Sequence, residues 1–123
     1  MSAQDTILIV DDDEINRKVA ALFLQRMGWQ TGQAASAAEA LEQMEKQAYA
    51  CLLLDISMPG MSGIELCQQL RRDERWKGLR LVAYTAHAMS DEQAAILQAG
   101  FDAIITKPLS RDALEAALGR TAG

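Results

Sequence analysis

Residues 51–63 have the sequence CLLLDISMPGMSG. The first four are apolar without interruption, which is typical of a β-strand that is buried on both faces. The strand runs directly into Asp55, and the Pro59-Gly60 dipeptide that follows is a strong turn signal. The buried strand fixes the backbone of an acid in this position, while the turn that follows leaves its side chain accessible. We therefore expect Asp55 to lie at the carboxyl edge of a buried sheet.

Similar apolar runs recur along the chain and alternate with longer amphipathic segments. They predict four more strands, at residues 6–10, 29–34, 80–84 and 103–106. Apolar periodicity, capping boxes at Ser36 and Ser90, and a C-terminal Gly100 predict helices at residues 14–27, 36–48, 64–72, 90–99 and 110–118. The first of these helices is predicted by the spacing of Ile15, Val19, Leu22, Phe23 and Met27. Five strand–helix units predict one α/β domain over residues 1–123, with three layers and a five-stranded parallel sheet.

Polar residues follow several of the predicted strands directly. Asp11, Asp12 and Asp13 follow the first strand, Asp55 ends the third, and Thr85 and Lys107 follow the fourth and fifth. Right-handed crossovers place the carboxyl ends of all parallel strands at one edge, where open α/β sheets bind ligands. We therefore expect these side chains to converge, although they span almost the whole chain.

Several carboxylates in one small volume require a balancing cation. Like charges about 4 Å apart repel by roughly 4 kcal/mol at an effective dielectric of 20. One lysine does not neutralise three acids, and a set of oxygen ligands suits Mg²⁺. Asp55 is the expected nucleophile because a carboxylate can attack phosphorus to form an aspartyl phosphate. Lys107 would neutralise a phosphoryl oxygen, and the Thr85 hydroxyl would donate a hydrogen bond to another.

Composition places the chain among soluble globular domains. It has 123 residues, 50% of them hydrophobic, and a formal net charge of −5. Scattered basic residues argue against direct nucleic-acid binding. Cys51 and Cys67 lie in apolar stretches without metal-ligand spacing, which is typical of reduced thiols. No signal peptide or membrane span is predicted, so we expect a cytoplasmic domain that is a monomer or a weak dimer.

Four blocks of sequence together resemble the bacterial response-regulator receiver family. They are ILIVDD ending at Asp12, LLLDISMPGMSG ending at Gly63, YTA around Thr85, and TKPL around Lys107. The resemblance covers essentially the whole chain. It implies a flavodoxin-like fold with strand order 2-1-3-4-5. It also implies a phosphoprotein of two-component phosphorelay signal transduction.

The resemblance assigns roles to the converging residues. Asp55 would be the phosphoacceptor. Asp12 would bind Mg²⁺ directly and Asp11 mainly through water, and the backbone carbonyl of Ser57 would complete the protein ligands. The chain would catalyse only its own phosphorylation and dephosphorylation, so it would not be an enzyme with a separate substrate.

The remaining implied roles concern switching. Thr85 would move toward the phosphoryl group, and Lys107 would pair with it before a cis peptide at Pro108. Ser57 and His87 would modulate the access of water to the acyl phosphate. The family usually has Tyr or Phe three residues before the lysine, whereas this chain has Ile104. The usual aromatic relay is therefore not expected here.

The resemblance also implies partners. The phosphoryl donor would be a phosphohistidine of a sensor histidine kinase or of a histidine phosphotransfer protein. Residues 11–20 and 85–89 look like receivers associated with hybrid histidine kinases. A chain of this length has no room for an output domain, so output would be contact with a downstream protein or a further relay step.

Two other functions fit parts of the pattern. A small Mg²⁺-dependent phosphohydrolase of haloacid-dehalogenase type would use Asp11 and Asp13, but that family expects Thr or Val where this chain has Ile15. A pseudo-receiver would bind partners without phosphorylation. The intact acids, threonine and lysine argue against it.

Overall fold

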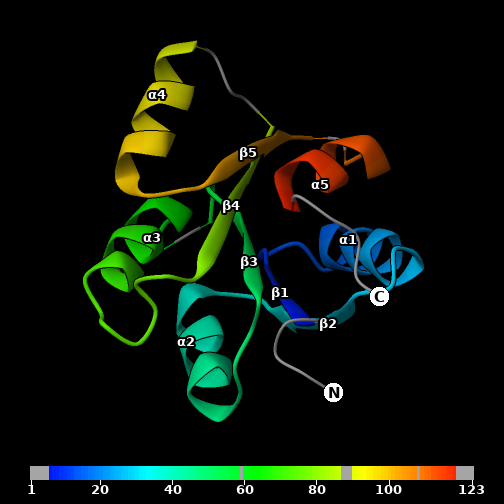
Figure 1. Ribbon diagram of the computed structural model, residues 1–123, viewed down its shortest axis with the longest axis horizontal. Helices are drawn as coiled ribbons and strands as arrows, with labels where there is room; N and C mark the ends of the chain where they lie inside the picture. Colours follow the sequence, from blue (N-terminus) through cyan, green and yellow to red (C-terminus); the bar gives the residue numbers. More distant parts are fainter. Residues whose placement is uncertain (1–5, 59, 87–89, 108, 119–123) are drawn as a thin grey trace.

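The computed structural model describes residues 6–58, 60–86, 90–107 and 109–118 (Figure 1). The strands are β1 (Thr6–Val10), β2 (Gln30–Ala34), β3 (Cys51–Asp55), β4 (Arg80–Thr85) and β5 (Ala103–Thr106). The helices are α1 (Glu14–Arg26), α2 (Ala37–Lys46), α3 (Gly63–Arg71), α4 (Ser90–Ala99) and α5 (Arg111–Leu118). Each predicted element is confirmed, with bounds that differ by at most two residues. None of the described helices is long and apolar enough to cross a membrane.

All strand pairs are parallel, in the predicted order β2-β1-β3-β4-β5. Figure 1 shows α1 and α5 on one face of the sheet and α2, α3 and α4 on the other, which confirms the three-layer fold. Every connection between neighbouring parallel strands crosses over through a helix. The carboxyl ends of the strands therefore share one edge.

The two central strands that end in acids are held on both faces. Alternate residues of β1 and β3 enter opposite core clusters, because successive side chains of a strand point to opposite faces. Ile9 and Leu53 pack beneath α1 and α5, whereas Val10 and Leu54 pack beneath the other three helices. All residues of β1 and β3 are buried. The backbone therefore has little freedom to shift, both just before Asp11 and at Asp55.

Helix α1 turns only some of its apolar residues toward the sheet. Its fully buried face is formed by Ala20, Ala21 and Leu24. Three of the residues that revealed its helical period are exposed instead, namely Ile15 (71%), Val19 (41%) and Leu22 (55%). The face of α1 that packs on the sheet therefore carries two small alanines and Leu24, whereas these three branched residues lie on its solvent side. The helical spacing of these apolar residues correctly predicted the helix, but it does not identify which face of the helix is buried.

Side-chain caps fix the starts of three helices near the loops. Asp13 Oδ1 accepts hydrogen bonds from the backbone N–H of Ile15 and Asn16. Ser36 Oγ accepts from Glu39 N, which is one of the two hydrogen bonds of its predicted capping box. A reciprocal box that the sequence analysis missed joins Ser62 and Glu65 at the start of α3. These caps satisfy backbone donors that would otherwise be unpaired.

Both cysteines are buried free thiols, as predicted. Burial raises the pKa of Cys51 to about 12 and that of Cys67 to about 11. Neither thiol is therefore a candidate nucleophile, because the reactive species is the thiolate.

Candidate functional site

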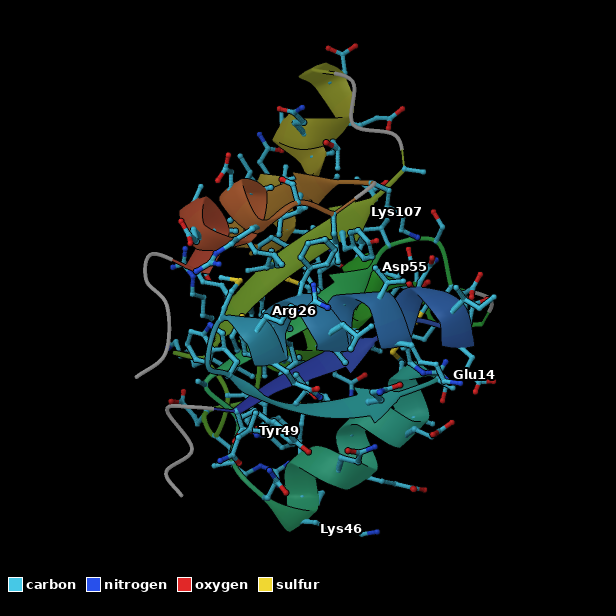
Figure 2. The ribbon with its side chains drawn as sticks, turned by 90° about the vertical axis from the view of Figure 1, so that its right-hand side faces the viewer. Glu14, Arg26, Lys46, Tyr49, Asp55 and Lys107 are labelled. Atoms are coloured by element: carbon cyan, nitrogen blue, oxygen red, sulfur yellow. The ribbon has the colours of Figure 1, made fainter. Side chains whose placement is uncertain are left out.

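The predicted convergence at the carboxyl edge is found. In Figure 2, Asp55 and Lys107 lie at the same edge of the sheet, where Glu14 begins α1. The side chains of Asp11, Asp12 and Asp55 each place an oxygen within 4.8 Å of the other two. Lys107 Nζ lies 3.8 Å from Asp11 Oδ2 and 3.6 Å from Asp55 Oδ2. Residues nearly a hundred positions apart therefore form one cluster.

The two buried acids are held in the same way. Asp11 Oδ1 accepts a hydrogen bond of 2.9 Å from the N–H of Asp13. Asp55 Oδ1 accepts one of 3.0 Å from the N–H of Ser57. Each carboxylate thus has one oxygen bound by the backbone two residues further along, in an Asx-turn arrangement. Its other oxygen faces the Lys107 ammonium.

The cluster suits a divalent cation. Asp11 is 1% exposed, and within the described part of the chain its Oδ2 has no hydrogen-bond partner. A buried carboxylate oxygen without a hydrogen bond is costly unless a cation compensates it. Asp12 is exposed, so the cluster opens to solvent on one side. Three hard oxygen ligands with solvent access fit Mg²⁺, which keeps several of its waters.

Electrostatics at Asp11 reflect this crowding. Burial, followed by the nearby charge of Asp55, raises the pKa of Asp11 to about 6. The Asp13 N–H and the Lys107 ammonium oppose this rise but do not cancel it. One ammonium therefore does not balance the site. A proton or a metal ion is favoured at Asp11.

Thr85 ends β4, and Lys107 follows the neighbouring strand β5. The N–H of Lys107 donates a 2.8 Å hydrogen bond to the carbonyl of Thr85, which aligns the two strand ends. Thr85 is buried, and the Lys107 side chain is 22% exposed. The Tyr84 ring lies beneath the ammonium, with Nζ 4.7 Å from the ring centroid. Burial and the charges of Asp11 and Asp55 raise the pKa of Tyr84 to about 12, so its phenol stays neutral.

Sequence reasoning missed the placement of Tyr84. The residue was recognised only as part of the YTA block, because the contact with Lys107 joins two different strands. The strand register could have predicted this contact, since Tyr84 lies directly opposite Asp55 in the pairing of β4 with β3. An aromatic residue at that register position must lie within a side chain's length of the reactive edge.

Gly63 supports Asp55 from the side of α3. A Cβ atom at this position would lie 2.5 Å from the backbone carbonyl oxygen of Asp55 and 3.0 Å from the Ile56 Cα. The Gly63 N–H also donates to the carbonyl of Ile56. The loop after β3 can therefore fold back against the strand end only because Gly63 has no side chain.

The other predicted residues have different placements. Asp13 is exposed and caps α1, so it is not part of the acid cluster. Ser57 is exposed beside Asp55, and the role of its carbonyl as a metal ligand remains a prediction. Ile104 is half-buried and packs toward the α2, α3 and α4 side, away from the face of Tyr84. His87 and Pro108 lie outside the described residues.

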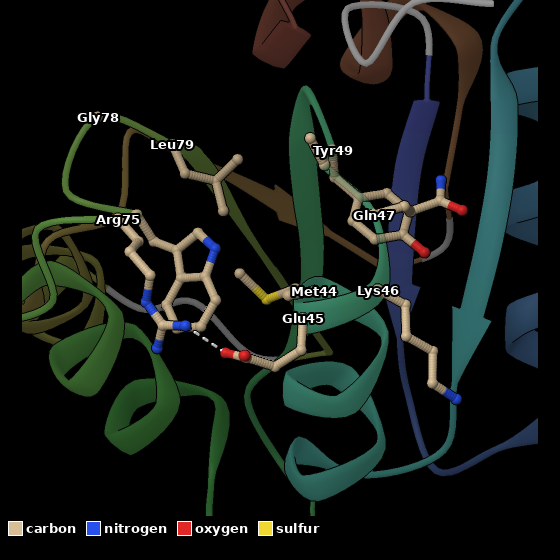
Figure 3. Close-up of a pocket in the computed structure, with 10 residues that line it drawn as sticks. Met44, Glu45, Lys46, Gln47, Tyr49, Arg75, Gly78 and Leu79 are labelled. Carbon is tan, nitrogen blue, oxygen red and sulfur yellow. Dashed lines mark hydrogen bonds and ion pairs between the residues drawn. The ribbon is translucent and has the colours of Figure 1, made fainter.

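A hollow among the described residues lies away from this cluster. A hollow of about 470 Å³ is lined by the end of α2 and the loops before β3 and β4, including Met44, Tyr49, Trp76 and Leu79 (Figure 3). These loops precede the strands, so the hollow is at the opposite edge of the sheet from Asp55. The Arg75–Glu45 ion pair spans it. This hollow is therefore separate from the acid cluster.

Comparisons with known proteins agree with this geometry. Residues 7–119 match the family described as the response regulator receiver domain. The sensor histidine kinase RcsC of Salmonella typhi is 38% identical over 114 residues, which cover 91% of this chain and 12% of RcsC. The polar-differentiation response regulator DivK of Brucella ovis is 33% identical over 105 residues, which cover 85% of each chain. The chain therefore spans most of DivK but a small part of RcsC.

A solved structure shows the same fold with a metal. The receiver domain of the sensor histidine kinase PA1611 from Pseudomonas aeruginosa has a TM-score of 0.83 and 28% sequence identity. The alignment covers 93% of each chain. That protein was crystallised with a magnesium ion coordinated in its active site cleft.

Replacing Gly63 with alanine should destabilise the domain by about 1–3 kcal/mol, because the methyl group must displace the Asp55 carbonyl or the start of α3. Gly78→Ala is the matched control, since a Cβ atom there meets nothing within 4 Å. Urea unfolding of the two variants and the wild type measures the difference. Equal stability of the two variants would show that the contact at Gly63 is not restrictive.

Replacing Asp11 with asparagine should stabilise the metal-free protein at pH 7 by about 1–3 kcal/mol while weakening Mg²⁺ binding. The raised pKa means that folding is penalised when Asp11 is charged. Well below the unfolded-state pKa of 3.8 the group is protonated in both the folded and the unfolded states, so the gain should vanish there. It should grow between about pH 4 and pH 6 and level off above the folded-state pKa of about 6.

Unfolding free energies of wild type and Asp11→Asn across this pH range provide the measurement. Asp12→Asn, at the exposed acid of the cluster, is the control and should change stability little. A gain for Asp11→Asn that did not vary with pH would contradict the electrostatic cause.

Proposed function

The chain belongs to the response regulator receiver domain family, and from this premise we propose that its Asp55 accepts a phosphoryl group from a phosphohistidine. The main support is the geometry of Asp55. The residue ends a buried strand, one of its oxygens is bound by the Ser57 N–H, and the other faces the Lys107 ammonium within a cluster of acids. Receiver domains are signalling phosphoacceptors of two-component systems, and this arrangement supports Asp55 as the acceptor.

In the proposed reaction, the Asp55 oxygen that faces Lys107 attacks the phosphorus of the donor. An oxygen–phosphorus bond forms, the bond between phosphorus and the imidazole nitrogen breaks, and the leaving imidazole takes up a proton. Lys107 is placed to neutralise a phosphoryl oxygen. Thr85, buried at the end of β4, would donate its hydroxyl proton to another phosphoryl oxygen. Most of the catalysis comes from positioning and charge neutralisation.

Asp11, Asp12 and Asp55 would hold Mg²⁺, with the Ser57 carbonyl as a further ligand. The bound ion would neutralise charge on the transferring phosphoryl oxygens. The Asp11 oxygen that has no hydrogen-bond partner supports this assignment. The Ser57 N–H and the Lys107 ammonium contact the two oxygens of the nucleophile, and the three acids would supply the negative charge that attracts the ion.

Phosphorylation would then act as a switch rather than as turnover of a separate substrate. It adds about −1.5 to −2 charges beside an ammonium that is already placed. The conformer in which Lys107 and Thr85 contact the phosphoryl group is stabilised. The family's usual Tyr or Phe is replaced by Ile104 in this chain. The conformational change would therefore be transmitted through the loop after Thr85 and through α4. Output would be contact with a downstream protein or a further relay step, without direct nucleic-acid binding.

The two alternatives have less support. In the phosphohydrolase reading, Asp13 would be a catalytic acid, yet its side chain caps α1 through two backbone N–H groups. A pseudo-receiver would have no need for three acids and a lysine in one cluster. The family match also favours neither reading.

We assign the donor to a histidine kinase or a phosphotransfer protein in the cytoplasm, with this domain as a monomer or weak dimer. Two buried free thiols fit a reducing compartment. RcsC and PA1611, by their names, are sensor histidine kinases, which supports an association with hybrid kinases.

The exposed face of α1 is the best surface for the donor. This helix begins three residues after Asp11, so a protein that delivers a phosphoryl group to Asp55 must lie beside it. Val19, Leu22, Phe23 and Arg26 line a depression of about 130 Å³ on the helix. A donor with an apolar surface next to its phosphohistidine would bury these side chains.

Incubation with acetyl phosphate and Mg²⁺ should add the mass of one phosphoryl group, and Asp55→Asn should abolish the gain. Asparagine keeps the shape of the side chain but removes the nucleophilic carboxylate. Intact-mass spectrometry with and without EDTA measures both points. An unmodified wild type, or a modified Asp55→Asn, would rule out the proposed acceptor.

Replacing Leu22 with glutamine should slow transfer from a phosphohistidine donor about five- to twentyfold, because the donor loses an apolar contact. The rate with acetyl phosphate, which needs no docking surface, should stay unchanged. Leu97→Gln on α4 is the matched control, since Leu97 is also an exposed helical leucine (48%). Equal effects of the two substitutions on transfer would place the donor elsewhere.

A further inference from the structure

The contact between Tyr84 and Lys107 is the one aromatic contact within the described site. The ammonium nitrogen lies 4.7 Å from the ring centroid, within the range of a cation–π interaction. The same nitrogen lies 3.6 and 3.8 Å from the oxygens of Asp55 and Asp11. Neither of these ion pairs is short enough to be a hydrogen bond. Charge therefore attracts the lysine, but the acids do not fix its direction.

The Tyr84 ring is a rigid surface. Tyr84 is buried in the core cluster beneath α1 and α5, together with Val82 and Ile105. It is paired with Asp55 on one side and with Ile105 on the other. Its carbonyl accepts a hydrogen bond from the Ile56 N–H, which ties the strand to the loop after Asp55. The ring and the nucleophile are therefore placed by the same section of sheet.

A lysine side chain needs such a surface. Its ammonium is a compact charge on a flexible four-carbon stem. Without a packing surface on one side, rotation of the lysine side chain can move its ammonium group away from the acids and into solvent. The Tyr84 face closes that side and attracts the ammonium through the negative potential of the ring.

We propose that Tyr84 is a positioning residue for phosphoryl transfer, whose ring face holds the Lys107 ammonium between Asp11 and Asp55. The inference rests on the proposed function, since it assumes that Lys107 meets the incoming phosphoryl group. Tyr84 itself does not touch the reacting atoms. Its effect is exerted through Lys107.

A spectroscopic test needs neither metal nor reaction. In the metal-free protein, the ring current of Tyr84 should displace the NMR signals of the Lys107 ε-methylene group upfield. The displacement should persist in Tyr84→Phe, which keeps the ring, and disappear in Tyr84→Leu. If the lysine signals are undisplaced in the wild type, or unchanged by Tyr84→Leu, the contact does not exist in solution and the proposal is wrong.

The kinetic test uses acetyl phosphate with saturating Mg²⁺. Tyr84→Leu should slow phosphorylation of Asp55 about three- to tenfold, the size expected for loss of a partly buried cation–π contact. Tyr84→Phe should restore the wild-type rate. Phe101→Leu is the matched control, because Phe101 is equally buried but packs in the cluster on the opposite face of the sheet.

A double-mutant cycle shows whether Tyr84 acts through Lys107. In the Lys107→Ala background, Tyr84→Leu should have no further effect on the residual rate. Should Tyr84→Leu fail to fold, Tyr84→Met supplies a flexible apolar filler without a ring, and the same loss is expected. A loss that persists without Lys107, or that Phe101→Leu reproduces, would identify Tyr84 as a packing residue only.

Different experimental results would contradict the proposed function and the positioning role of Tyr84. If the wild type gains no phosphoryl group, the acceptor assignment fails while the NMR test of the contact still stands. If the wild type is phosphorylated but Tyr84→Leu reacts at the same rate, only the positioning role is lost.

Discussion

Among the described residues, repulsion between the carboxylates of Asp11, Asp12 and Asp55 is opposed at the edge of the sheet by the ammonium group of Lys107. The cluster persists because the backbone beneath it cannot relax. Strands β1 and β3 are buried on both faces, and each buried acid is bound by an N–H two residues further along. The free energy of packing the core therefore maintains an arrangement that the charges alone would disperse. A site of this kind gains stability when a cation binds.

Much of this could be predicted from the sequence because the decisive signals are local. An apolar run followed by an acid marks a strand end, and parallel topology then brings distant strand ends together. The positions of Asp11, Asp55 and Lys107 followed from these two facts. The Ser62 cap was missed although its pattern was present, because the start of α3 was placed one residue later.

Other features could not be predicted, for physical reasons. Apolar residues occupy more than one side of α1, and in the folded domain Ala20 and Ala21 are buried while Ile15 is exposed. The spacing of apolar residues predicts the helix, but it does not determine which of these sides packs on the sheet. The Tyr84–Lys107 contact is likewise a product of strand register and of the path of a long side chain.

The exposed apolar residues of α1 lie apart from the acid cluster, so partner recognition and phosphoryl transfer would use different residues. The reactive side chains follow strands and are fixed by the core, whereas Val19 and Leu22 stand on an outer helical surface that the core does not constrain. Substitutions on that surface can alter the choice of partner at little cost to folding. Recognition and reaction can therefore diversify independently in such a domain.

The Asx turn at Asp55 has a stereochemical consequence. Because the Ser57 N–H engages Oδ1, the two oxygens of the carboxylate are not equivalent, and rotation about the terminal bond would break that hydrogen bond. Only Oδ2 presents its lone pairs toward the lysine. In the proposed phosphoryl transfer, the protein backbone would thus select one oxygen for bond formation and with it the direction from which a donor approaches.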